Sequence, residues 1–196
     1  MTKRHDLTPA DILPWPEYAR ARAEHRRRIG AIKRNRRVDV GPHVTFYFES
    51  FDTMWLQVQE MLHIEQGGAA QLADELAAYN PLVPKGAELV ATFMIEIEDP
   101  ARRARILASL GGIEERVFLE VGGERVAAEA EADQDRTNAD GKASAVQFVH
   151  FHLSPGQIDA FRREGAKVVI GIDHASYSHM AILPEAVRAE LSEDFD

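Results

Sequence analysis

The sequence predicts a single α+β domain, with a mostly antiparallel sheet of about five to six strands flanked by helices and a basic helix near the N-terminus. The chain has 196 residues, of which 45% are hydrophobic and 28% charged, enough to bury one core but few for two. Strand-like segments follow one another as hairpins instead of alternating regularly with helices, which favours α+β over a doubly wound parallel sheet. No repeat or long linker marks a boundary, so we expect one domain over residues 1–196.

Helices are expected where apolar residues recur every three to four positions behind a capping residue. Thr8-Pro9-Ala10-Asp11 has a hydroxyl at the N-cap, proline at the first helical position and an acid in the first turn, so it begins a helical arm over about 8–37. Within this arm a long basic helix runs from about Pro16 to Arg34. Further helices are expected at about 54–65, 69–79, 100–110, 155–164 and 184–191.

Strands are expected where apolar and polar residues alternate between turn-forming residues. In residues 43–49, Val44, Phe46 and Phe48 share one face, and the intervening residues point the other way. Gly122-Gly123 suits a tight hairpin turn. The acidic segment at about 131–142 has few apolar residues, and we expect a mobile surface loop there. The remaining strands are expected at about 38–40, 88–98, 117–121, 126–130, 144–153 and 168–172.

Basic residues are concentrated near the N-terminus, although the whole chain has a net charge of −9. Nine basic residues and one acid lie between Arg20 and Arg37. This segment can bind a small anion or an acidic protein, or it can form salt bridges inside the fold or between the subunits of a homodimer, and these alternatives stay open. The acidic remainder and the lack of a recognition motif argue against nucleic-acid binding. The residues that we expect to bind an anion or a partner are Lys33, Arg34, Arg36 and Arg37.

Several classes of function are excluded or unsupported. The chain has no cysteine, which excludes disulfides, thiolate metal sites and cysteine nucleophiles and favours a reducing compartment. No apolar run approaches the roughly 20 residues that cross a bilayer, and no signal-peptide core follows the first basic residues, so we expect a cytoplasmic protein and no membrane association. Phosphate-binding glycine loops and serine-nucleophile elbows are also missing.

The strongest metal hypothesis concerns His150-Phe151-His152. Residues two apart on a strand share a face, so both imidazoles could reach one ion, joined by His174 at the end of the next strand and His179 in the loop after it. Zinc, iron or manganese would suit such ligands. The alternative is that these histidines are packed and hydrogen-bonded without a metal, because Val146 and Phe148 occupy the same face.

A second metal hypothesis concerns Glu60 and His63, which have the Glu-x-x-His spacing of di-iron helical bundles. Those bundles need a second copy of the motif, and this chain has none, so an exposed polar helix face is the alternative. His43 could join the pair across the fold. In either site, Asp173 or Glu65 could accept a proton from a metal-bound water.

Six segments spread over nearly the whole chain form one recognisable pattern when they are taken together. They are Lys33-Arg34-Asn35-Arg36-Arg37-Val38, Gly41-Pro42-His43, Phe48-Glu49, residues 59–65, residues 79–84, and Ile172-Asp173-His174 with Tyr177. In combination they resemble an uncharacterised bacterial family, the domain of unknown function 3501. The chain departs from the family pattern at Ala175, where the family has proline after the Asp-His pair, and His150-Phe151-His152 is not a family motif.

This resemblance implies no particular activity. Members of the family are encoded beside rubrerythrin-like proteins and iron–sulfur oxidoreductases, which suggests oxidative-stress or iron-linked redox metabolism by association. One hypothesis is therefore a non-catalytic accessory or interaction protein with a partner in a redox system, and the other is a small metal-binding protein or metal-dependent enzyme. If the family shares a site, the matching positions are Arg34, Arg36, Arg37, His43, Glu60, His63, Glu65, Asp173, His174 and Tyr177.

Overall fold

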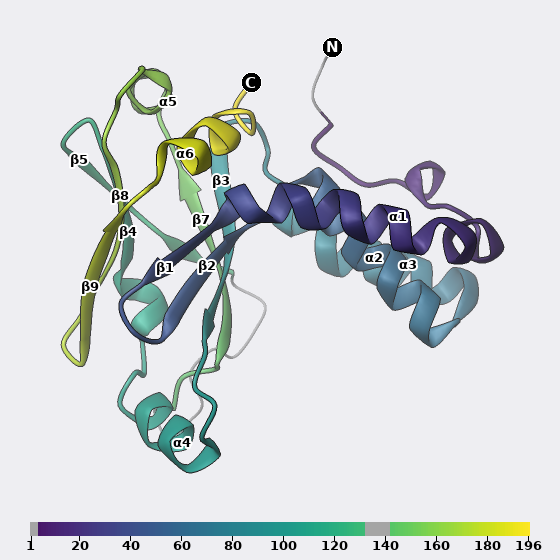
Figure 1. Cartoon of the computed structure of the whole chain (residues 1–196), viewed down its shortest axis with the longest axis horizontal. Helices are drawn as coiled ribbons and strands as arrows, with labels where there is room; N and C mark the ends of the chain where they lie inside the picture. The colour runs from purple at the N-terminus through teal and green to yellow at the C-terminus, as the bar shows by residue number, and fades with distance from the viewer. Residues whose placement is uncertain (1–3, 132–141) are drawn as a thin grey trace.

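The computed structural model describes residues 4–131 and 142–196, and within them the strands form two antiparallel sheets (Figure 1). The five-stranded sheet has the order β1-β2-β3-β7-β6 and the four-stranded sheet the order β5-β4-β8-β9. The predicted α+β class and the antiparallel pairing are confirmed, but the strands are divided between two sheets instead of one. Most of the acidic segment that we expected to be a loop lies outside the described residues.

Most strand boundaries lie close to the expected ones. The single strand expected at 126–130 is instead two short strands that belong to different sheets, and one further strand lies near the C-terminus. In the five-stranded sheet they are β1 (Arg37–Val40), β2 (Val44–Phe48), β3 (Glu88–Ile95), β7 (Val146–His152) and β6 (Glu129–Ala130). In the four-stranded sheet they are β5 (Glu124–Ala127), β4 (Val117–Val121), β8 (Val168–His174) and β9 (Tyr177–Ile182).

Strand β9 is the one that sequence analysis missed, and His179 lies on it and not in a loop. Met180 and Ile182 are 65% and 60% exposed, so the strand lacks the buried alternating face from which strands are recognised. Antiparallel pairing with β8 at six positions, and not a pattern of its own, holds β9 in place. Ile170 lies opposite Ala181, and Ile172 opposite His179.

The helices also follow the predicted order. They are α1 (Trp15–Lys33), α2 (Phe51–Glu65), α3 (Gly68–Tyr79), α4 (Pro100–Ala108), α5 (Pro155–Arg162) and α6 (Glu185–Ser192). Ser50 caps α2 by accepting a hydrogen bond from the Thr53 amide, and α2 ends at Gln66 in the left-handed conformation. Thr8 to Asp11 forms only a single 3-10 turn before α1 begins. No helix among the described residues combines the length and apolarity needed to span a bilayer.

Two apolar clusters hold the fold together. The larger lies between the sheets, where Phe46, Phe93 and Phe151 are buried against residues such as Leu119 and Ile170. The smaller lies among α1, α2, α3 and the outer face of the five-stranded sheet, with Tyr18, Trp55, Val58 and Val90 among its members. Figure 1 shows α1, α2 and α3 lying alongside one another beyond the sheets. The candidate site lies where these helices meet the outer face of the five-stranded sheet.

Candidate functional site

A cavity of about 600 Å³ lies between the outer face of the five-stranded sheet and the helices. We call it the outer-face cavity. Strand alternation supplies its floor, because Tyr47, Thr92 and Phe148 point away from the core between the sheets, where Phe46, Phe93 and Val149 are buried. The complete lining consists of Gly30, Lys33, Arg34, Arg37, Tyr47, Glu49, Met54, Gln57, Tyr79, Leu82, Thr92, Met94, Val146 and Phe148.

The cations of this cavity come from the end of α1 and the start of β1. Lys33 and Arg34 are exposed and form no ion pair with any residue in the described part of the chain. Arg37 is 3.0 Å from Asp39, and its guanidinium lies 5.7 Å from the centre of the Tyr47 ring. Three of the four residues expected to bind an anion therefore line one mainly apolar cavity.

The polar groups deeper in the cavity are already hydrogen-bonded. Glu49, which is buried, accepts hydrogen bonds from the Thr53 hydroxyl at 2.6 Å and from the Thr92 hydroxyl at 2.7 Å. Burial raises the pKa of the Tyr47 phenol, and the nearby Glu96 carboxylate raises it further, so the phenol keeps its proton at neutral pH. Sequence analysis did not name these residues as site residues, although Phe48-Glu49 is one of the segments that carry the family resemblance.

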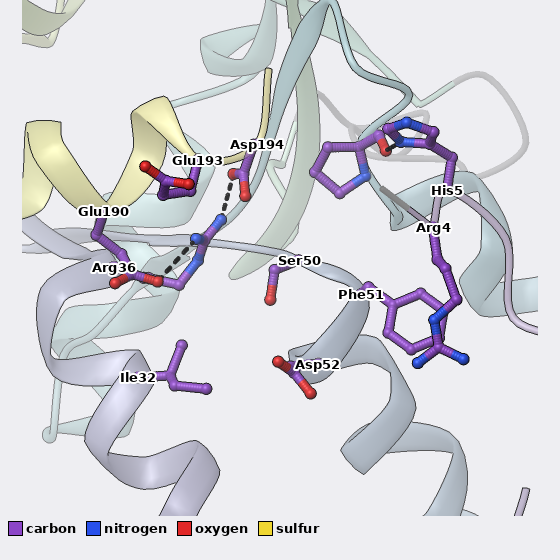
Figure 2. Close-up of a pocket in the computed structure, with 11 residues that line it drawn as sticks. Arg4, His5, Ile32, Arg36, Ser50, Phe51, Asp52, Glu190, Glu193 and Asp194 are labelled. Atoms are coloured by element: carbon purple, nitrogen blue, oxygen red, sulfur yellow. Dashed lines mark hydrogen bonds and ion pairs between the residues drawn. The ribbon is translucent and has the colours of Figure 1, made fainter. Parts of the chain in front are cut away.

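Arg36, the fourth residue of the expected anion-binding set, is only 2% exposed. It forms ion pairs with Asp194 and, at 3.3 Å, with Glu190, and it donates hydrogen bonds to the Phe48 and Glu49 carbonyls at 3.0 and 2.7 Å. Figure 2 shows its guanidinium between the two carboxylates at a cleft of about 280 Å³. Arg36 thus joins the C-terminal region to the start of α2.

Other basic residues of α1 are also neutralised inside the fold. Arg22 and Arg26 approach the Glu60 carboxylate at 2.7 and 2.8 Å, and the Tyr18 hydroxyl donates to it at 2.6 Å. The hydrogen bond from Arg22 outweighs the effect of burial and lowers the pKa of Glu60 to about 2. The alternative of an internal salt-bridge network therefore describes much of the basic segment. Its exceptions among the described residues are Arg20, Arg27, Lys33 and Arg34, of which Lys33 and Arg34 line the outer-face cavity.

His150 and His152 lie together on β7 beside acidic residues. The rings stack with centroids 6.1 Å apart, and Glu88 Oε2 lies 3.1 Å from His150 Nδ1 and 3.3 Å from His152 Nδ1. The other ring nitrogen of His150 contacts Glu131 at 2.8 Å. Burial alone would lower the pKa of His150, but the hydrogen bonds with Glu88 and Glu131 outweigh it and raise the pKa above its usual 6.5.

We expect this cluster to make stability fall as the pH rises above neutrality. Folded His150 binds its proton more tightly than unfolded histidine, so its contribution is complete below pH 6.5 and is lost as the pH rises through the raised pKa. Glu88 acts in the opposite sense. Burial alone would raise its pKa, but the contacts with His150 outweigh burial and lower the pKa below 4.5. The contribution of Glu88 is therefore complete above pH 4.5 and is lost as the pH falls through the lowered pKa. Thermal unfolding from pH 3 to 9 measures both effects, and NMR titration of the imidazoles measures the raised pKa of His150 directly.

His150→Gln should remove the fall in stability at the alkaline side. His152→Gln is the matched control, because this imidazole is 56% exposed and should leave most of the pH dependence in place. A wild-type melting temperature that does not change between pH 6 and 9, or an equal change in both variants, would contradict the assignment to His150.

The remaining residues of the sequence-based sites lie elsewhere. His174 is on the other sheet, where its ring nitrogens contact the Gly111 carbonyl at 3.3 Å and the Ser176 amide at 3.2 Å. Asp173 is exposed and lies 3.3 Å from Arg125. His63 stacks on Trp15 with ring centroids 5.6 Å apart. The structure therefore brings His150 and His152 together, and places His174 and the Glu60–His63 pair away from them.

Tyr177 and His43 belong to a joint between the sheets. The Tyr177 hydroxyl donates to the Val40 carbonyl at 2.7 Å and accepts from the His43 and Val44 amides at 3.0 and 3.1 Å. Burial raises the pKa of this phenol, so it remains a donor at neutral pH. Over residues 4–131 and 142–196, no group of three or more His, Asp or Glu side chains is arranged to hold a metal ion.

Comparison with known proteins agrees with the resemblance in the sequence. The profile of the family described as Protein of unknown function (DUF3501) matches residues 6–195. The chain belongs to this family. A crystal structure from Burkholderia pseudomallei, described as a novel protein of unknown function at 1.90 Å resolution, is similar to this DUF3501 protein with 39% identity and a TM-score of 0.90. The alignment covers 97% of this chain and 99% of that one. Among curated proteins, no sequence matches the chain.

Five of the six segments that carry the DUF3501 resemblance divide into two groups in the structure. Three of them contribute to the outer-face cavity, through Lys33, Arg34, Arg37, Glu49, Tyr79 and Leu82. Gly41-Pro42-His43 and Tyr177 instead form the joint between the sheets. The family pattern thus marks both a structural joint and the lining of a cavity.

Proposed function

We propose that this DUF3501 protein is a non-catalytic binding protein, and that its ligand is an amphipathic anion held in the outer-face cavity. The observation that carries the proposal is the position of Lys33 and Arg34, two exposed cations without an ion pair among the described residues, at a cavity with an apolar floor. A carboxylate or phosphate group would meet these cations, and an apolar body would cover Met94, Val146 and Phe148.

The dimensions and chemistry of the cavity support this ligand class. Its volume of about 600 Å³ is within the range of sites for small organic molecules. Val146 is 41% exposed, so a ligand on the floor would remove apolar surface from water, at about 25 cal/mol for each Å² buried. Tyr47 and Tyr79 add ring surface and hydroxyl groups that can orient a polar substituent.

Dodecanoate should bind the full-length protein, and its affinity should fall with added salt because part of the attraction is between exposed charges. Replacing Lys33 and Arg34 together with serine should lower the affinity about tenfold, as hydrogen bonds to charged groups contribute about 1.5–3 kcal/mol before exposure reduces them. Isothermal titration calorimetry measures both effects.

The control variant replaces Arg20 and Arg27 with serine. These residues are exposed cations of α1 that do not line the cavity, so the change in net charge is the same and the affinity should change less than about twofold. Dodecylamine tests the sign of the ligand charge, and inorganic phosphate tests the head group alone. The proposal fails if dodecylamine binds as tightly as dodecanoate, or if both double variants weaken binding equally.

The metal-binding alternative has weaker support. Glu88 Oε2 lies within 3.3 Å of ring nitrogens of both His150 and His152, but among the described residues these side chains do not form a group arranged to hold a metal ion. Hydrogen bonds account for the same distances, and elemental analysis of protein purified without chelator distinguishes the two explanations. A partner in a redox system and a homodimer, both expected from the sequence, remain predictions.

A further inference from the structure

A second cavity, of about 400 Å³, lies among α1, α2, α3 and the segment before α1. We call it the helical cavity. Gln57 of α2 lines the outer-face cavity and Gln59 lines this one, because residues two apart on a helix point about 200° apart. Its lining consists of Ile12, Leu13, Pro14, Trp15, Tyr18, Gln59, Leu62, His63, Gln66, Gly68, Ala69 and Leu72.

Two buried nitrogen atoms in this lining lack hydrogen-bond partners. Gln59 is 1% exposed, and its Nε2 has no partner among the described residues. His63 Nδ1 is also buried, and it also has no hydrogen-bond partner among the described residues. A buried polar atom without a partner costs free energy, and native proteins rarely keep one. Gln59 Nε2 is a donor, and His63 Nδ1 is one when it carries the ring proton, so the two atoms together point to an absent acceptor.

The charge around the cavity indicates that this acceptor belongs to a neutral molecule. Among the residues that the structure describes, no Lys, Arg, Asp or Glu side chain lines the cavity. Glu60, which accepts the hydroxyl of the lining residue Tyr18, is neutralised by Arg22 and Arg26. An anion entering here would lose its hydration without meeting a cation that is not already paired.

The aromatic side chains add a preference for a ring. Trp15 and His63 are stacked with an angle of 14° between their planes, and Tyr18 meets His63 edge-on with centroids 5.8 Å apart. Trp15 is 47% exposed and stands at the cavity, so a bound ring would cover part of its face.

We infer that the helical cavity binds a neutral, mainly apolar molecule that contains a ring and one carbonyl-type oxygen. Gln59 Nε2 donates a hydrogen bond to that oxygen, and His63 donates a second when its proton is on Nδ1. Leu62, Leu72 and the rings of Trp15 and Tyr18 enclose the apolar part. This site is separate from the anion site and does not depend on it.

Acetophenone and isopropylbenzene test the inference, because they have nearly the same shape and only acetophenone has a carbonyl oxygen. Titration of the full-length protein, followed by NMR at the Gln59 side-chain amide and the Trp15 indole, should show acetophenone binding about tenfold more tightly. Equal affinities for the two compounds, or no saturable change at these resonances, would overturn the inference.

Gln59→Leu separates a ligand-binding role from a structural one. It removes the unpartnered donor at similar volume, so the ligand-free variant should melt at the same temperature or higher, and its preference for acetophenone should disappear. Gln147→Leu is the matched control, since Gln147 is fully buried between the sheets and lines neither cavity. A lower melting temperature for Gln59→Leu with acetophenone binding unchanged would show that the amide has a structural role. His63→Phe keeps an aromatic ring and removes the ring nitrogens. Its melting temperature and its affinity for acetophenone therefore distinguish a ligand-binding role of His63 from a structural one in the same way.

Discussion

Replacing Arg36 with methionine should lower the free energy of unfolding by about 3–5 kcal/mol, the range found when one member of a buried ion pair is removed. The guanidinium is 3% exposed and the Asp194 carboxylate 9%, so neither charge is well hydrated in the folded protein. The substitution removes the cation near Asp194 and Glu190, and it also removes the donors to the Phe48 and Glu49 carbonyls. Urea unfolding monitored by circular dichroism measures the loss.

Arg37→Met is the control for this prediction. Arg37 is the next residue in the chain and also contacts a carboxylate, but its side chain is 50% exposed and Asp39 is 64% exposed. Exposed ion pairs contribute about 0–1 kcal/mol, so the loss should be several-fold smaller. Equal losses in the two variants would mean that Arg36 does not join the C-terminal region to the body of the protein.

Gly41→Ala should lower the free energy of unfolding by about 2–5 kcal/mol. Gly41 has φ of +70°, and a left-handed backbone costs an alanine about 1–2 kcal/mol. An added Cβ would also lie 2.6 Å from the His179 ring and 2.7 Å from the Tyr177 hydroxyl, and crowding of this kind costs about 1–3 kcal/mol more. The exposed His179 ring can move, but three hydrogen bonds hold the Tyr177 hydroxyl.

Gly123→Ala separates the two contributions. Gly123 has φ of +85°, and a Cβ added there would meet no atom within 4 Å, so only the backbone cost of about 1–2 kcal/mol should appear. Urea unfolding of the two variants should therefore show a larger loss for Gly41→Ala. If the losses are the same, the contact of the β1–β2 turn with Tyr177 does not contribute to stability.

Most helices and strands could be predicted because their signals are local. The run Val44, Phe46, Phe48 buries its apolar side in the core between the sheets, as its alternation predicts. Ser154-Pro155 begins a helix where a hydroxyl cap and a proline at the first position predict one. Strand β9 could not be predicted in this way, because its exposed Met180 and Ile182 interrupt the expected pattern.

The candidate sites were predictable only in part. Charge density alone identified Lys33, Arg34 and Arg37, but it could not distinguish them from Arg36, which occupies the same run and is buried. The spacing of His150 and His152 predicted that they share a face, and they do. The unpartnered amide of Gln59 had no signal in the sequence, since nothing local indicates which glutamine of a helix lacks a partner.

The sequence by itself determined the α+β class, the order of most elements, the concentration of basic residues near the N-terminus and the membership that the family profile confirms. These properties depend on periodicity, capping and composition, which act over a few residues. Only the tertiary structure decided which cations are buried, which residues line the two cavities and which histidines meet. Those outcomes depend on contacts between residues far apart in the chain, such as Arg36 with Asp194 and Val40 with Tyr177, and no local pattern encodes the partner.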